Sequence, residues 1–233
     1  MRYMGSKGRH AKHIVPFLMS GHDQNKPYVE PFLGGGNLFS EVPAKFKWGN
    51  DTAKYAVALL KALSLGWQPP TSLSETVYYD IKEDPHRYDS ELVGFAAYCC
   101  SYAGKFWGGY ARGKDSKGNA RNFAAEQARN LENQRHGLIG AKFTSLNYLE
   151  MDIEPGSTVY CDPPYQNSTS YQGKFDHDLF WKWCKELSEK GCRVFVSEYN
   201  APDGVECVWQ KSVTNSLTKN TGAKQGCEKL FRL

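Results

Sequence analysis

The first part of the chain alternates between short apolar strands and amphipathic helices. A helical pattern over 9–19 is followed by a strand over 27–30, a short helix that Asn37 would cap, a strand over 46–50 and a helix over 52–65. The last of these helices has its apolar side chains on one face and ends before a glycine. Strands that alternate with helices in this order predict a parallel sheet covered by helices.

The middle of the chain breaks this rhythm. Aromatic side chains alternate with lysine and arginine, and four glycines predict a loop or hairpin over 105–122. A helical pattern returns over 123–134. We interpret 66–136 as a mainly helical insertion, which leaves 1–65 and 137–233 as the two parts of one α/β domain.

The last region resumes the alternation of strands and helices. Strands are predicted over 142–145, 157–161 and 193–197, with a helix over 177–189 before the third strand. The apolar face of this helix is expected to contain Leu179, Phe180, Trp183 and Leu187. Two final strands, over 205–209 and 228–233, predict an antiparallel edge of the same sheet.

A glycine-rich turn follows the first predicted strand, at the end where a parallel sheet places its ligands. The segment reads Glu30-Pro-Phe-Leu-Gly-Gly-Gly36, and glycines let a backbone turn tightly and approach a ligand closely. Asp51 closes the next strand, where an acidic residue accepts hydrogen bonds from ribose hydroxyls in dinucleotide sites. Together these features predict a nucleoside-binding cradle. The turn has no Walker lysine, which argues against phosphoryl transfer.

The most specific motif is Asp162-Pro163-Pro164-Tyr165, which directly follows an apolar strand. The exocyclic amino nitrogen of a nucleobase is a poor nucleophile because its lone pair is delocalised into the ring. The Asp162 carboxylate and the Pro163 carbonyl can hold both amino protons and so favour a pyramidal nitrogen. The two prolines stiffen the loop, and Tyr165 offers a ring face on which a flipped base can stack. The motif therefore predicts chemistry on an exocyclic amine.

Positive charge is concentrated in two segments, although the net charge is only +4. Residues 1–22 contain four lysines and arginines and no acidic residue, and residues 104–136 contain seven basic residues and three acidic ones. Localised positive charge is typical of a surface that meets phosphates. A charged segment can equally be a solvated face, so this signal depends on the motifs beside it.

The composition adds a few exclusions. Apolar residues make up 40% and charged residues 23%, as in globular proteins. The seven cysteines form no C-x-x-C pair, which indicates core side chains in a reducing compartment, and the histidines lack the spacing of metal ligands. No segment resembles a signal peptide or approaches the roughly 20 apolar residues of a membrane span. We therefore expect a soluble intracellular protein with no metal and no membrane partner.

The motifs resemble those of a known family. Phe32-x-Gly34-x-Gly36 followed by Asp-Pro-Pro-Tyr is similar to the amino-methyltransferases that act on DNA. With Tyr3-Met-Gly-Ser-Lys7, the chain resembles in particular the Dam-type (D12 class) adenine methyltransferases, including phage and prophage forms. The resemblance implies a Rossmann-like methyltransferase fold and S-adenosyl-L-methionine as the methyl donor, with S-adenosyl-L-homocysteine as the product. It also implies a monomer that methylates adenine N6 in double-stranded DNA, with base flipping, in the cytoplasm of a bacterial host.

The resemblance also implies roles for individual residues. The catalytic loop would consist of Asp162, Pro163, Pro164 and Tyr165. The cofactor would be bound by Tyr3, Lys7, Glu30, Phe32, Gly34, Gly36, Asp51, Tyr148 and Asp162. Residues 66–136 would form the target-recognition domain, with DNA contacts from Lys105, Arg112, Lys114, Lys117 and Arg121. Asn147-Tyr148 departs from the Asp-Phe pair common in the family, and no metal is required because a sulfonium is already a good leaving group.

Three alternatives remain open from the sequence. Methylation of cytosine N4 uses almost the same loop chemistry, because both targets are exocyclic amines. A non-catalytic DNA-binding protein on the same fold is disfavoured by the intact loop, and RNA is disfavoured by the basic insertion and the resemblance. Cys161 precedes the catalytic motif, but it lies inside a strand and outside any cytosine-C5 motif, so covalent cytosine chemistry is rejected.

Overall fold

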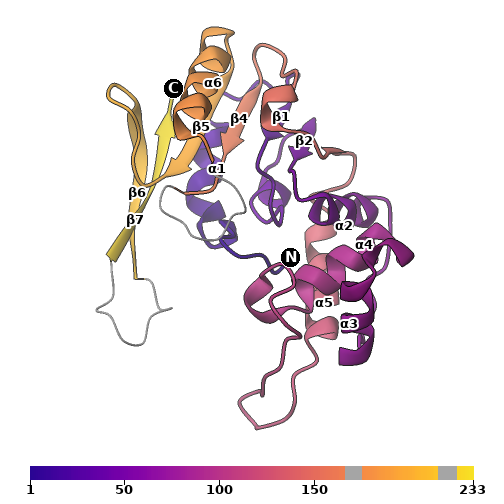
Figure 1. Cartoon of the computed structure of the whole chain (residues 1–233). Coiled ribbons are helices and arrows are strands. Elements are labelled where there is room, and N and C mark those ends of the chain that lie inside the picture. Colours follow the sequence, from indigo (N-terminus) through magenta and orange to yellow (C-terminus); the bar gives the residue numbers. More distant parts are fainter. Residues whose placement is uncertain (166–174, 215–224) are drawn as a thin grey trace.

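The computed structural model of the chain describes residues 1–165, 175–214 and 225–233. Its centre is a seven-stranded sheet in the order β3-β2-β1-β4-β5-β7-β6 (Figure 1). The strands are β1 (Tyr28–Glu30), β2 (Lys47–Asn50), β3 (Lys142–Thr144), β4 (Thr158–Cys161), β5 (Arg193–Glu198), β6 (Glu206–Thr214) and β7 (Gln225–Arg232). The pairs among β1–β5 are parallel, whereas β7 is antiparallel to both β5 and β6. The predicted α/β fold with an antiparallel C-terminal edge is confirmed.

The strand order reverses between β1 and β4. From β1 the chain adds β2 and β3 on one side, and it later adds β4 and β5 on the other. The two central strands pair directly, with Val29 opposite Val159. In open α/β sheets, ligands bind outside the carboxyl ends of the strands at such a reversal. The glycine turn after β1 and the Asp-Pro-Pro-Tyr loop after β4 both start at this point.

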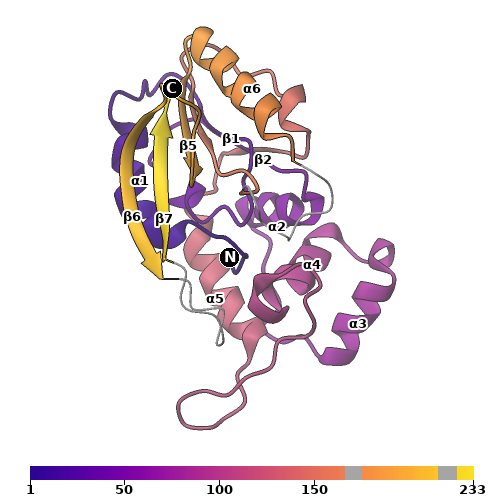
Figure 2. The same cartoon turned by 60° about the vertical axis from the view of Figure 1, so that its left-hand side comes forward.

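Alternating side chains along the strands fill a hydrophobic core on each face of the sheet. Tyr28, Tyr160 and Phe195 pack on one face with α1 (Ala11–Met19) and α2 (Lys54–Ser64). Val29, Val159 and Val194 pack on the other face with α6 (His177–Glu189). Figure 2 shows α1 and α6 on opposite sides of the strands.

The segment 66–136 is mainly helical, as predicted. It contains α3 (Glu75–Glu83), α4 (Ser90–Gly94), which continues into a π-helical turn (Phe95–Cys99), and α5 (Phe123–Arg135). These helices gather beside α2 (Figure 1), and side chains such as Val93 and Leu131 belong to the same core as Leu60 of α2. The segment is therefore packed onto the sheet domain through a shared apolar core.

Two local predictions were wrong. Leu179 is 40% exposed because α6 turns only Phe180, Trp183, Cys184 and Leu187 toward the sheet. Asn37 does not cap a helix, since the short 3-10 turn Phe39–Glu41 starts after Leu38. Its side chain instead donates to the Met1 carbonyl and to Ser6 Oγ, both at 2.8 Å. The final strands are also longer than predicted.

Candidate active site

The glycine turn after β1 has a backbone that only glycine adopts without strain. Gly34 and Gly36 have φ values of 51° and 61°, in the left-handed region. The Tyr3 side chain lies over this turn, so a Cβ at Gly34 would come within 3.0 Å of its ring and one at Gly35 within 2.6 Å of its Cβ. Tyr3 itself stacks on Tyr98, with ring centroids 5.1 Å apart. The Tyr3 side chain therefore covers the turn that the sequence predicts to be a nucleoside-binding cradle.

Asp51 supports the glycine turn from the neighbouring strand. Its Oδ2 accepts a hydrogen bond from the Gly34 amide at 2.7 Å, and its Oδ1 accepts one from the Ala53 amide at 2.9 Å. Burial raises the pKa of Asp51, although both backbone hydrogen bonds act in the opposite direction. Asp51 thus holds the turn and the start of α2 in place, whatever it contributes to ligand binding.

The predicted cofactor residues Phe32 and Tyr148 meet in an aromatic cluster. Their ring centroids are 5.2 Å apart, and Tyr148 also packs edge-on against Trp183 of α6 at 5.0 Å. Phe175 and Phe180 complete this cluster beside them. It forms an apolar wall on the α6 side of the turn, where a purine ring can pack.

The Asp162–Tyr165 motif follows β4 and lies beside the N-terminal segment. Lys7 Nζ lies 3.0 Å from Asp162 Oδ1, and the same ammonium lies 4.4 Å from the centroid of the Tyr165 ring. The Lys7 side chain is only 9% exposed and that of Asp162 is 20% exposed. Lys7 and Asp162 lie far apart in the sequence, and the fold brings them together as one largely enclosed ion pair.

A residue that the sequence analysis missed joins this ion pair. Glu228 Oε2 accepts a hydrogen bond from the Tyr165 hydroxyl at 2.8 Å and lies 3.7 Å from Lys7 Nζ. Glu228 is on β7, two positions before the buried Leu230, so strand periodicity places both on the same face. The alternation of side chains along β7 could have identified Glu228 from the sequence, because an acidic residue on the inward face of a strand needs a polar partner. We call Lys7, Asp162, Tyr165 and Glu228 the Lys7 cluster.

Electrostatics in the Lys7 cluster follow from its burial. Burial alone would lower the pKa of Lys7, but Asp162 and Glu228 outweigh it and hold this pKa above its ordinary value. Burial raises the pKa of Asp162, with Lys7 acting in the opposite direction and Glu228 in the same direction. Burial beside the two carboxylates also raises the pKa of Tyr165, so its hydroxyl stays protonated and donates. One cation thus serves two carboxylates.

Glu30, at the end of β1, is fully enclosed behind the glycine turn. It accepts a hydrogen bond from the Tyr28 hydroxyl at 2.6 Å. Burial raises its pKa from 4.5 to about 8 despite this hydrogen bond. The Glu30 side chain, predicted to bind the cofactor, is therefore hydrogen-bonded to the core residue Tyr28 in this structure.

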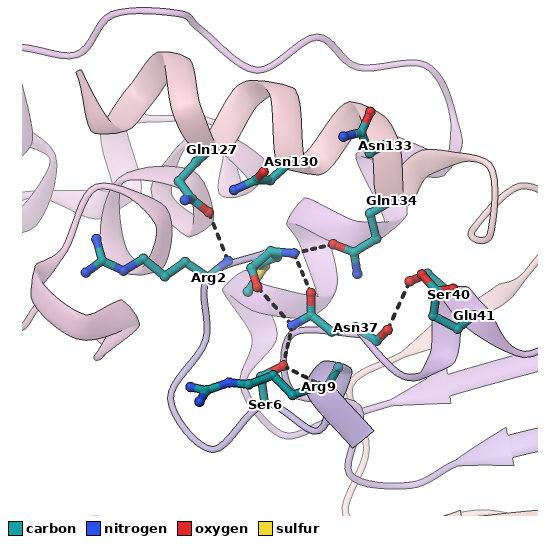
Figure 3. Close-up of a pocket in the computed structure, with 12 residues that line it drawn as sticks. Arg2, Ser6, Arg9, Asn37, Ser40, Glu41, Gln127, Asn130, Asn133 and Gln134 are labelled. Atoms are coloured by element: carbon teal, nitrogen blue, oxygen red, sulfur yellow. Dashed lines mark hydrogen bonds between the residues drawn. The ribbon is translucent and has the colours of Figure 1, made fainter. Parts of the chain in front are cut away.

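A polar cavity of about 520 Å³ lies between the N-terminal segment and α5 (Figure 3). The Met1 amino group donates to Asn37 Oδ1 at 2.6 Å and to Gln134 Oε1 at 2.5 Å. Gln134 in turn donates to the Gly35 carbonyl at 2.9 Å. These contacts connect α5 of the segment 66–136 directly to the glycine turn.

The five predicted DNA contacts lie on or near an exposed hairpin. Lys114 faces Ala120 across an antiparallel bridge, and Asp115 closes the tip by accepting hydrogen bonds from the Lys117 and Asn119 amides at 2.8 and 2.9 Å. The two arginines are engaged by nearby carboxylates. Arg112 pairs with Glu75, and Arg121 donates to Glu126 at 2.9 Å while lying over the Phe123 ring. Lys105, Lys114 and Lys117 are exposed.

Within 1–165, 175–214 and 225–233, no three His, Cys, Asp or Glu side chains gather as metal ligands do. Across the same ranges, no helix has the length and apolar character needed to cross a membrane. Cys161 is buried inside β4, as the rejection of covalent cytosine chemistry requires.

Comparison with known proteins supplies the family. A family model described as D12 class N6 adenine-specific DNA methyltransferase matches residues 3–219. Among solved structures, the chain is similar to the tRNA (m1A58) methyltransferase TrmI from Aquifex aeolicus, at 9% identity and a TM-score of 0.41, over 99% of this chain and 69% of that one. No curated protein matches the chain.

The family match decides what the sequence left open. It covers nearly the whole chain, including the glycine turn and the catalytic loop, and it names adenine N6 rather than cytosine N4 as the target. The expected methyl donor, S-adenosylmethionine, and an enzymatic rather than a purely DNA-binding role agree with this match. The chain belongs to the D12 class of N6 adenine-specific DNA methyltransferases.

Proposed function

We propose that the chain methylates adenine N6 at specific sites of double-stranded DNA, with the target base rotated out of the helix. One observation carries the proposal: the Asp162–Tyr165 loop and the glycine turn leave adjacent strands at the reversal of the sheet, with Lys7 held 3.0 Å from Asp162. A base inside a duplex cannot reach such a recessed carboxylate, so extrusion is required.

The glycine turn fits S-adenosylmethionine. The left-handed turn at Gly34 and Gly36 packs closely under the Tyr3 side chain, and each Asp51 oxygen retains acceptor capacity beyond its one backbone hydrogen bond. Tyr3, Gly34, Gly36 and Asp51 would hold the cofactor, with Phe32 and Tyr148 as the apolar wall. When bound, the cofactor supplies an activated methyl group.

The residues of the Lys7 cluster prepare the amino nitrogen. The Asp162 carboxylate and the Pro163 carbonyl accept hydrogen bonds from its two protons, which keeps the lone pair out of the ring. Lys7 favours the ionised form of Asp162, as the acceptor role requires. Asp162 need not be a strong base, because the nitrogen becomes acidic only as it gains the methyl group. Catalysis is then mainly positioning and electrostatics.

The segment 66–136 would recognise the target sequence. Its hairpin presents exposed lysines that can meet phosphates, and its two paired arginines have the fork geometry that reads guanine. Gln134 of α5 donates a hydrogen bond to the glycine turn, so the segment that would recognise DNA directly contacts the turn that would bind the cofactor. We expect the active unit to be one chain on one site.

Labelled methyl transfer tests this function. The purified chain is incubated with tritiated S-adenosylmethionine and with duplex DNA, single-stranded DNA or RNA of the same sequence. Hydrolysis to nucleosides and mass spectrometry should find N6-methyl-2′-deoxyadenosine from the duplex, and far less methylated product from the other two. Label in cytosine, a preference for RNA, or no transfer to any substrate would overturn the proposal.

A further inference from the structure

Glu228 is the one carboxylate of the Lys7 cluster that the proposed reaction does not use. Its side chain is 15% exposed and lies on the antiparallel edge of the sheet, opposite Lys211 of β6. From there it touches both ends of the site: the Tyr165 hydroxyl at 2.8 Å and the Lys7 ammonium at 3.7 Å. A carboxylate that is largely removed from water is costly unless it is paired, so its placement calls for an explanation.

The Tyr165 ring is held on several sides at once. Lys7 Nζ lies over one face of the ring, and Tyr199 packs edge-on with its centroid 4.7 Å away. The contacts with Lys7 and Tyr199 oppose rotation of the ring about its long axis, and the hydrogen bond to Glu228 anchors its hydroxyl end against swinging about the Cα–Cβ bond. A ring that stacks on a flipped base works best when its plane is set before the base arrives.

We propose that Glu228 is a positioning residue for methyl transfer, which fixes the Tyr165 ring through its hydroxyl and holds the Lys7 ammonium between itself and Asp162. This inference rests on the proposed function of the Asp162–Tyr165 loop. It makes the antiparallel β6–β7 edge part of the active site, because β7 delivers a charge to a loop that follows β4.

Glu228 also influences the charge of Asp162. The groups around the Asp162 carboxylate are Lys7 from the N-terminal segment, Glu228 from β7, Tyr165 and Tyr160 from the β4 region, Tyr199 after β5 and Glu30 from β1. Among these, the negative charge of Glu228 raises the pKa of Asp162. Removing that charge should move the acidic limb of the rate profile to lower pH.

Substitutions at Glu228 test the proposal in the full-length protein. Glu228→Ala should lower kcat by about 10- to 100-fold, as for a lost hydrogen bond to a charged group, while the KM for S-adenosylmethionine stays within about threefold. Glu228→Gln keeps an acceptor for the Tyr165 hydroxyl, so it should retain more activity and should shift the acidic limb of the kcat profile downward. The matched control is Glu206→Gln, an exposed carboxylate on β6 that pairs with Arg232 at 3.6 Å.

A double-mutant cycle shows whether Glu228 acts through Tyr165. Tyr165→Phe removes the bonded hydroxyl, and the double variant with Glu228→Ala should be no slower than Glu228→Ala alone. Should Glu228→Ala fail to fold, the activity and pH profile of Glu228→Gln decide the question. An active wild type whose Glu228→Gln variant keeps an unchanged kcat and acidic limb overturns this inference alone, whereas an inactive wild type overturns the proposed function. Additive losses in the double variant would overturn action through Tyr165.

Discussion

Lys7 and Arg112 are both cations beside a carboxylate, but their surroundings differ. Lys7 is 9% exposed and lies between Asp162 and Glu228, whereas Arg112 is 71% exposed and pairs with Glu75 on the surface. Removing one partner of a buried pair leaves an uncompensated charge and costs several kcal/mol, roughly 3–5. An exposed pair contributes about 0–1 kcal/mol, because water and salt screen it.

The difference teaches what each region can do. The Lys7 cluster is preorganised: its members hold one another at fixed distances before any substrate arrives. The hairpin is free to bind a ligand. Its arginines can leave their weak surface ion pairs and bind a phosphate or a base edge instead, at little cost in free energy. In the proposed function, chemistry would therefore take place at the Lys7 cluster, and DNA recognition would be carried out by the exposed hairpin.

The largest effect is expected from Asp162→Ala. Methyl transfer should fall by at least about 10²- to 10³-fold, because the acceptor for the amino group is lost. Affinity for S-adenosylmethionine should change less than about tenfold, since Gly34 and Asp51 lie outside the altered group. Lys7 keeps Glu228 as a counter-ion, so the variant should fold. Single-turnover rates and calorimetric binding check this, with the exposed Asp203→Ala as control, and near-normal turnover would remove Asp162 from the mechanism.

Neutralising the hairpin should have the next largest effect, on DNA affinity and not on stability. Replacing all five basic residues by alanine should weaken duplex binding by roughly 100-fold at 0.1 M salt, for a few phosphate contacts and one base contact. Lys114→Ala and Lys117→Ala should each lower the salt slope by about one unit, whereas Arg112→Ala or Arg121→Ala should relax sequence preference at one position.

The control for this comparison lies on α6, where Lys182 and Lys185 are exposed and pair with acids of their own helix. Their double alanine variant should bind DNA normally. Glu75→Gln frees Arg112 and should raise DNA affinity slightly, with little change in the free energy of unfolding because the pair is exposed to water. Unchanged DNA binding after all five substitutions would show that the hairpin is a solvated surface loop.

Asp51→Ala should be intermediate in size. Loss of a charged acceptor in the cradle should raise the dissociation constant for S-adenosylmethionine by about 30- to 150-fold, which is roughly 2–3 kcal/mol. The Gly34 and Ala53 amides also lose their partner, so the melting temperature should drop as well. Asp23→Ala, which removes an exposed turn acceptor, is the matched control. A lower melting temperature with unchanged cofactor affinity would restrict Asp51 to a structural role.

The smallest effect concerns pH and stability. Burial raises the pKa of Glu30 from 4.5 to about 8, so between these values the folded chain binds a proton that the unfolded chain releases. The stability contributed by the protonated form is therefore lost as pH rises through this window. Glu30→Gln should remove this loss, so the stability of the variant should fall less than that of the wild type between about pH 5 and pH 8, and urea unfolding measures it. Parallel pH curves for wild type and variant would show that Glu30 titrates normally.

Much of the fold and half of the site were predictable because they depend on local signals. The strand before each motif, the glycines at 34 and 36 with positive φ, and the Asp-Pro-Pro-Tyr loop all depend on neighbours a few positions away. The outward turn of Leu179 was missed because a helical period alone does not say how wide the buried stripe is. The role of Asn37 was missed because its partners, Met1 and Ser6, are more than 30 positions away.

The sequence by itself determined the order of the elements, the parallel sheet with its antiparallel edge, and the two loops that meet at the strand reversal. Only the tertiary structure decided that Lys7 pairs with Asp162 and that Glu228 holds Tyr165. The physical reason is that a turn or a helix is specified by contacts between near neighbours. A buried ion pair instead depends on the register of β7 against β5 and on where the N-terminal segment crosses the sheet.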